Sequence, residues 1–123
     1  MPLKLLLDEN LRNAGLWLAI QTRNAAEPQP LNVIRVGDEG TPPCRTPDPD
    51  LIQWAATHDR VLISRDKSTL PRHLQNYLAS GETSPGIVLL PEGMRISNTV
   101  ELLFLIAFIT EATEWANACR WTQ

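Results

Sequence analysis

The sequence predicts an α/β fold, a three-layer α/β/α sandwich around a mainly parallel sheet of four to five strands. Short apolar segments alternate along the chain with longer segments whose apolar residues recur at helical spacing. Turn-forming residues separate these segments, and only one connection is long. Alternation of strand and helix favours right-handed crossovers, which place helices on both faces of a parallel sheet.

The first strand and helix are predicted from the beginning of the chain. Residues 3–7 are mostly leucine, and the polar residues Asp8, Glu9 and Asn10 follow them directly. Asp8 or Asn10 is suited to cap the next helix, because short polar side chains accept hydrogen bonds from free backbone amides. A second strand is predicted at 31–36, where β-branched residues recur before a glycine-rich turn.

The longest loop, residues 41–49, contains four prolines and cannot form a regular element. We expect a helix from about Asp48, with Pro49 in its first turn, where proline is tolerated. The third and fourth strands are predicted at 61–64 and 86–90, two short apolar segments bounded by turns.

Two further helices complete the alternation. One is expected over about 71–79 after a cap at Ser68 or Thr69, and the last begins at residue 97 or 98 and extends to about residue 116. The tail, 119–123, is a candidate for a short edge strand.

Length and composition fit a single domain that covers residues 1–123. The net charge of −3 has the wrong sign for binding nucleic acid through bulk charge, so metal ions and a local basic patch would have to attract RNA. The two cysteines, Cys44 and Cys119, are far apart, which favours a reducing compartment. No signal peptide is visible, and the apolar run 100–109 is too short to span a bilayer, so we expect a cytoplasmic protein.

Acidic residues follow three of the predicted strands and begin the second helix. They are Asp8, Glu9, Asp38, Asp48, Asp50 and Asp66. Because the carboxyl ends of parallel strands meet at one edge of a sheet, we expect several of these carboxylates to lie close together. Crowded carboxylates repel one another, and hard oxygen ligands select Mg²⁺ or Mn²⁺ over zinc. The pattern therefore predicts a site for divalent metal ions.

Helix capping is the competing explanation, since an aspartate at a helix start satisfies free amides and suits the helix dipole. Taken singly, Asp8, Asp48 or Asp66 is explained by capping. Capping does not explain acidic residues after three consecutive strands, all on the side of the sheet where ligands bind.

The segments LLLDEN at 5–10, PDPDLIQWA at 47–55 and RVLISRDK at 60–67 resemble the PIN-like nuclease-related family of bacteria. The resemblance continues through SPGIVLL at 84–90 and so covers nearly the whole chain. It implies a PIN-type fold and an endoribonuclease that depends on Mg²⁺ or Mn²⁺. It also implies a toxin of a bacterial toxin–antitoxin pair, with an RNA substrate and a small helix-turn-helix antitoxin encoded nearby.

The resemblance assigns roles to particular residues. Asp8, Asp48 and Asp66 match the acidic residues expected to bind metal and support catalysis, and Asp38 matches a frequent further acid. One position departs from the family pattern, because Ser68 stands where many relatives have another aspartate.

The remaining site residues are expected around these aspartates. Glu9 would complete or orient the metal ligands, and the cations Arg65 and Lys67 would steady a substrate phosphate. We expect three further residues to orient the metal ligands without binding the metal themselves: Asn10, Ser68 and Asp50.

Two other interpretations remain open. A binding module that retains the acids without turnover would act through a protein partner, and the very apolar last helix would suit such a contact or a homodimer. A phosphoacceptor receiver domain also carries an acidic pair after its first strand, but the Pro91-Glu92-Gly93 turn after the fourth strand supplies no lysine for that site.

Overall fold

The computed structural model describes residues 2–121, without the side chain of the last of these. Its strands are β1 (Leu5–Leu7), β2 (Val33–Arg35), β3 (Val61–Ser64), β4 (Ile87–Leu89) and β5 (Cys119–Trp121). Its helices are η1, a 3-10 turn (Glu9–Leu11), α1 (Ala14–Ala26), α2 (Asp48–Thr57), α3 (Leu70–Ala79), α4 (Ile96–Phe108) and α5 (Ala112–Trp115).

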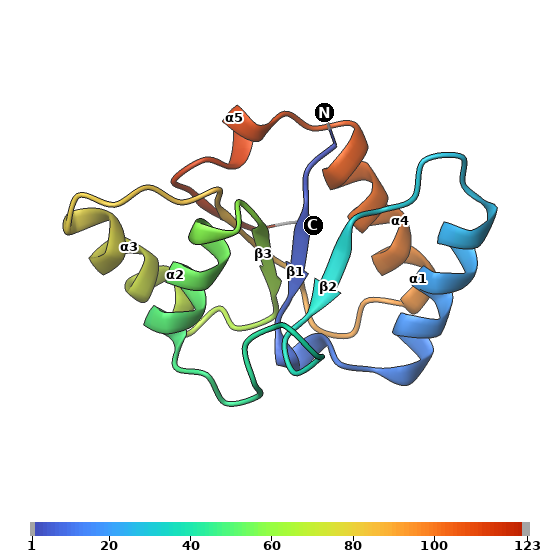
Figure 1. Ribbon diagram of the computed structural model, residues 1–123, viewed down its shortest axis with the longest axis horizontal. Coiled ribbons are helices and arrows are strands. Elements are labelled where there is room, and N and C mark those ends of the chain that lie inside the picture. Colours follow the sequence, from blue (N-terminus) through green and yellow to red (C-terminus); the bar gives the residue numbers. More distant parts are fainter. Residues whose placement is uncertain (1, 122–123) are drawn as a thin grey trace.

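The five strands form one parallel sheet in the order β2-β1-β3-β4-β5. Helices α1 and α4 cover one face of the sheet, and α2 and α3 cover the other (Figure 1). This arrangement confirms the predicted α/β/α sandwich, including the additional edge strand at the end of the chain.

The core consists of two apolar layers, because alternate side chains of a strand point to opposite faces of the sheet. Leu5, Leu7 and Ile63 pack with the helices α1 and α4, whereas Leu6 and Leu62 pack with α2 and α3. Strands β1, β3 and β4 are thus buried on both faces, which explains why they appear in the sequence as nearly continuous apolar runs.

Several element boundaries differ from the predictions at the beginning of the chain. Asn13, and neither Asp8 nor Asn10, caps α1, where its side chain accepts a hydrogen bond from the amide of Leu16 at 2.9 Å. Asp8 caps the short η1 turn, which the sequence did not indicate. Strand β2 is shorter than predicted, because the amide of Leu31 bonds to the side chain of a helix residue and not to the neighbouring strand.

The last long helix was predicted to continue to about residue 116, and that prediction is wrong. Helix α4 ends at Phe108, and the hydroxyl of Thr110 donates to the carbonyl of Ile106. A separate turn, α5, then begins with a capping box made by Glu111 and Glu114. Within residues 2–121, no helix is long and apolar enough to cross a membrane.

Candidate metal centre

Three of the predicted acidic residues lie on segments at the carboxyl edge of the sheet, the lower edge in Figure 1. Asp8 follows β1, Asp48 begins α2, and Asp66 lies two residues beyond the end of β3. Strands β1 and β3 are hydrogen-bonded neighbours, so their ends are adjacent although they are far apart in the sequence.

Asp8 is the most buried of these acids, with 6% of its surface exposed. Its backbone amide donates to the carbonyl of Ile63 at 2.9 Å, which extends the ladder between β1 and β3. One carboxylate oxygen accepts from the amide of Glu9 at 2.7 Å, and the other accepts from the hydroxyl of Ser64 at 2.7 Å. Burial raises the pKa of Asp8 above its ordinary value, the two hydrogen bonds oppose that rise, and the charges of Asp48 and Glu9 add to it.

Ser64 connects the ends of β1 and β3. The side chain is fully buried, and its hydroxyl donates to Asp8 while accepting from the side-chain amide of Asn10 and from the backbone amide of Asp66, both at 3.0 Å. Asn10 in turn accepts from the backbone amide of Arg65 at 3.2 Å. A single hydroxyl therefore holds Asp8 in register with the turn that carries Asp66.

Asp66 is held by the turn that leads into α3. One carboxylate oxygen accepts from the amide and hydroxyl of Ser68, at 3.0 and 2.9 Å, and from the amide of Thr69 at 3.1 Å. The other oxygen accepts from the hydroxyl of Thr69 at 2.6 Å. Burial raises the pKa of Asp66, but the hydrogen bonds from Thr69 and Ser68 together outweigh it and hold the pKa below its ordinary value.

The hydroxyl of Thr69 lies between two carboxylates. Its oxygen is 2.6 Å from Oδ2 of Asp66 and 2.7 Å from Oδ2 of Asp48. A hydroxyl carries one proton, so it can donate to only one of these oxygens at a time. The Nε2 atom of His73 lies 4.0 Å from the same oxygen of Asp48. An acid at the start of α2 and an acid on the turn after β3 thus compete for one proton.

Other predicted residues are placed differently. Glu9 accepts the backbone amide of Arg45 at 2.7 Å and thereby fastens the proline-rich loop beside Asp8. Asp50 is exposed on the first turn of α2.

Asp38 does not join the hydroxyl-linked group of Asp8, Asp48 and Asp66. Its carboxylate forms ion pairs with Arg12 at 2.7 Å and Arg35 at 3.0 Å. Hydrogen bonds from Arg35 and Arg12 hold its pKa below the ordinary value despite some burial. The charge of Asp38 is already neutralised by the protein.

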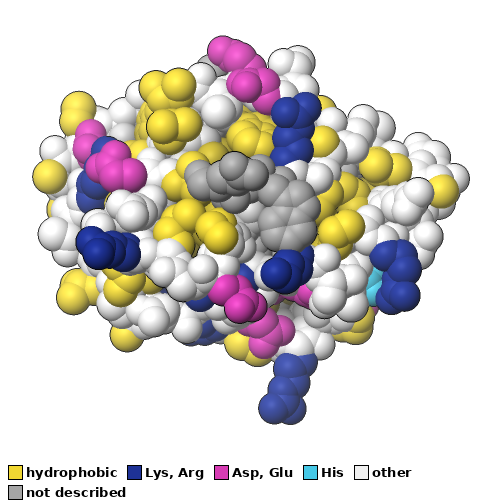
Figure 2. Space-filling view, turned by 180° about the vertical axis from the view of Figure 1, so that it is seen from behind, with side chains coloured by type: hydrophobic (Ala, Val, Ile, Leu, Met, Phe, Trp, Pro, Cys, Tyr) yellow, Lys and Arg dark blue, Asp and Glu magenta, His cyan; other side chains and the backbone are white. Residues whose placement is uncertain are grey.

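The two expected phosphate-binding cations lie on the turn after β3. Lys67 is exposed there, and Arg65 is partly buried. The Nε atom of Arg65 is buried and has no hydrogen-bond partner within residues 2–121. An unsatisfied buried donor is costly, and such an atom marks a position where a ligand could bind. Positive side chains are not gathered into one patch on the face in Figure 2, where they occur singly and lie beside acidic ones at the lower edge.

Sequence reasoning missed the two hydroxyls that join the acids. Ser64 was predicted only as the last residue of the third strand, and Thr69 only as a helix cap. Ser64 had a visible signal, since it is the one polar residue of an otherwise apolar buried strand and a buried polar group needs a partner. Thr69 stands three residues after Asp66, a spacing that suits a local side-chain hydrogen bond.

The donor set fits a hard cation, because carboxylate and hydroxyl oxygens are ligands for Mg²⁺ and Mn²⁺. The raised pKa of Asp8 indicates negative charge that the protein alone does not fully balance, whereas Ser68 and Thr69 already stabilise the charge of Asp66. In the described part of the chain, however, no three acidic, histidine or cysteine side chains are already arranged around a common metal position. Binding would require Thr69 to release one of its carboxylates.

Comparisons with protein-family models, with curated proteins and with solved structures found no match to this chain. The site is therefore interpreted from its own geometry.

Proposed function

We propose that the protein is a metal-dependent endoribonuclease that hydrolyses RNA phosphodiester bonds, with Asp8, Asp48 and Asp66 as the residues that bind the metal. The observation that carries this proposal is the hydroxyl of Thr69 shared between Asp48 and Asp66 at the carboxyl ends of the strands. In open parallel sheets, ligands bind at this edge.

The electrostatics of Asp8 support the proposal. A carboxyl group whose pKa is raised by burial and by neighbouring acids is destabilised in its charged form, and a divalent cation would relieve that cost. Bound Mg²⁺ or Mn²⁺ would neutralise phosphate charge and lower the pKa of a coordinated water.

The chain's own residues would supply the rest of the site. The Nε of Arg65, buried and without a partner within residues 2–121, would donate to a phosphate oxygen once the turn after β3 moves to uncover it, since guanidinium groups bind phosphate with directed hydrogen bonds. Lys67 would add charge from the same turn. Ser64 would keep Asp8 oriented, and Glu9 would hold the loop beside it through the amide of Arg45.

The narrower assignment, a toxin paired with a small helix-turn-helix antitoxin, rests on the resemblance of the LLLDEN and RVLISRDK segments alone. A neighbouring reading frame for a short helix-turn-helix protein would support it.

A second candidate is a binding module without turnover. It is favoured by the way Ser68 and Thr69 already satisfy both oxygens of Asp66 without any metal. Ser68 is also the position where the family pattern has a further aspartate.

Calorimetric titration with Mn²⁺ and cleavage of single-stranded RNA separate the two candidates. The nuclease should bind Mn²⁺ and cleave RNA, and both properties should be lost in Asp8→Asn and Asp66→Asn. Asp50→Asn is the matched control, because this acid is exposed and outside the hydroxyl-linked group. Cleavage that survives in both Asp8→Asn and Asp66→Asn would refute the assignment, and absence of Mn²⁺ binding in the wild-type protein would favour the binding module.

A further inference from the structure

The large apolar side chains exposed within residues 2–121 all belong to one helical layer. They are Leu18 on α1, Ile96 and Leu105 on α4, and Ile109, which ends α4. The layer of α2 and α3 on the opposite face of the sheet has no such residue. Exposed apolar side chains concentrated on one layer are typical of an interaction surface.

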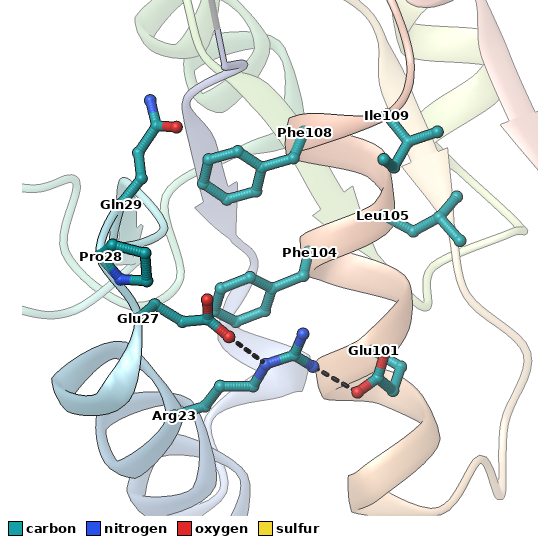
Figure 3. Close-up of a pocket in the computed structure, with 9 residues that line it drawn as sticks. All are labelled: Arg23, Glu27, Pro28, Gln29, Glu101, Phe104, Leu105, Phe108 and Ile109. Carbon is teal, nitrogen blue, oxygen red and sulfur yellow. Dashed lines mark hydrogen bonds and ion pairs between the residues drawn. The ribbon is translucent and has the colours of Figure 1, made fainter.

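Two of these side chains line a groove between the ends of α1 and α4, shown in Figure 3. The groove has a volume of about 380 Å³. Phe104 and Phe108 project from α4 toward Pro28 on the opposite wall, whereas Leu105 and Ile109 point to the other side of α4 (Figure 3). Leu105 and Ile109 are 50% and 73% exposed, so the apolar surface is open to a partner.

The apolar character of this part of α4 exceeds what its own core requires. Leu103, Ile106 and Ala107 already pack in the core, whereas Leu105 and Ile109 face outward four residues apart. Side chains at this spacing lie one above the other on a helix and can hold the apolar face of a second helix.

The charges at the groove indicate the chemistry of the partner. Arg23 donates through Nε to Glu27 at 3.2 Å and through Nη1 to Glu101, and its guanidinium lies 4.1 Å from the ring centre of Phe104. Each of these hydrogen bonds uses one oxygen of its carboxylate. The groove therefore has an excess of negative charge, because two carboxylates share the one guanidinium of Arg23. The side chain of Glu101 is 71% exposed and so can contact a partner.

We propose that this groove binds a basic amphipathic helical segment of another protein, with leucine-like side chains against Leu105 and Ile109 and lysine or arginine beside Glu101. The proposal does not depend on nuclease activity, because the groove lies where α1 and α4 end and the acids lie at the carboxyl edge where these helices begin. A second copy of this chain would fit less well, since two copies of net charge −3 would bring four carboxylates and only two arginines together.

Two synthetic peptides of roughly 14 residues test the proposal, both with leucine at helical i, i+3, i+4 spacing. The remaining positions are lysine in one peptide and glutamate in the other. Fluorescence anisotropy with the full chain at physiological salt should show the leucine/lysine peptide binding at least about tenfold more tightly than the leucine/glutamate peptide.

Variants locate the binding surface. Leu105→Ser combined with Ile109→Ser should lower the affinity for the leucine/lysine peptide by about tenfold or more. Both positions are exposed enough for the fold to persist. Glu101→Lys should reduce the ratio of the two peptide affinities by at least about fivefold. Leu18→Ser is the matched control, because this leucine is 67% exposed on the same layer but does not line the groove.

The outcomes divide clearly. Loss of binding in the serine double variant with normal binding in the Leu18 variant supports the proposal. Equal affinity for the two peptides, or equal losses in both variants, overturns it. Sedimentation showing a wild-type dimer that the double variant dissociates would also overturn it and assign the groove to a second copy. RNA cleavage should be unchanged in the double variant, so failure here is distinguishable from failure of the nuclease proposal.

Discussion

The buried hydroxyl of Ser64 gives a stability prediction whose size depends on pH. In Ser64→Ala, the carboxylate of Asp8 loses its side-chain donor and keeps only the amide of Glu9. A hydrogen bond to a charged group contributes about 1.5–3 kcal/mol, whereas one between neutral groups contributes about 0.5–1.5 kcal/mol. The substitution should therefore cost about 1–1.5 kcal/mol more at a pH where Asp8 is ionised than at a lower pH where it is protonated.

The raised pKa of Asp8 determines how the stability loss in Ser64→Ala changes with pH. Because that pKa is raised in the folded protein, its ionisation disfavours the folded state, and this cost appears as the pH rises above the unfolded value and through the folded one. The hydrogen bond from Ser64 limits the cost, so its removal must be felt more strongly at the higher pH. Urea unfolding of wild-type and variant proteins at both pH values measures the difference.

Thr99→Val provides the matched control. Thr99 is also a buried hydroxyl residue, but its hydroxyl donates to the backbone carbonyl of Arg95 at 2.9 Å, a group that does not titrate. Its cost should be the same at both pH values. If the cost of Ser64→Ala is equally insensitive to pH, the inferred coupling between Ser64 and a charged Asp8 is wrong.

Three other substitutions test separate parts of the structure, each by urea unfolding. Asp38→Asn should lower the free energy of unfolding by less than about 1 kcal/mol near pH 7, because the ion pairs of Asp38 are near the surface. The loss should shrink as the pH falls through the lowered pKa of Asp38, and a loss that grows toward low pH would contradict this. Gly86→Ala should cost about 3 kcal/mol or more, since φ of Gly86 is +112° and a Cβ would lie 2.1 Å from the carbonyl oxygen of Trp115. Gly81→Ala should cost only about 1 kcal/mol, because Gly81 has φ +93° but open space around it. Similar losses at both glycines would show that the close contact is absent. Asn13→Ala should cost about 1 kcal/mol because α1 loses its N-cap hydrogen bond, and an unchanged stability would show that Asn13 does not stabilise the start of α1.

The fold was predictable because its strongest signal is local. Strands buried on both faces appear as short runs such as Leu5–Leu7, and alternation with helices leaves few topologies. The helix boundary after Phe108 was not predictable, because residues 109–116 contain no glycine or proline to mark a helix end.

The site was predictable only in part. Asp8, Asp48 and Asp66 were expected to meet, since parallel strands bring their ends to one edge. The hydroxyl of Thr69 joins the carboxylates of Asp48 and Asp66, and that of Ser64 joins Asp8 to the backbone amide of Asp66, but within residues 2–121 no three acids surround a common metal position. The ion pair of Asp38 with Arg12 was not predictable because Arg12 is distant in sequence, although Arg35, the other partner, stands only three residues before Asp38. Whether a hydroxyl bridges two acids is decided by side-chain rotamers, on which sequence spacing gives no information.

The nuclease proposal requires Asp8, Asp48 and Asp66 to bind a divalent metal ion together. Anomalous diffraction from crystals soaked in Mn²⁺ tests this requirement. The proposal predicts a peak within about 2.5 Å of oxygens from these aspartates, with the hydroxyl of Thr69 turned away from at least one of them. A map with no peak there, and with the hydroxyl of Thr69 still between Asp48 and Asp66, would contradict it.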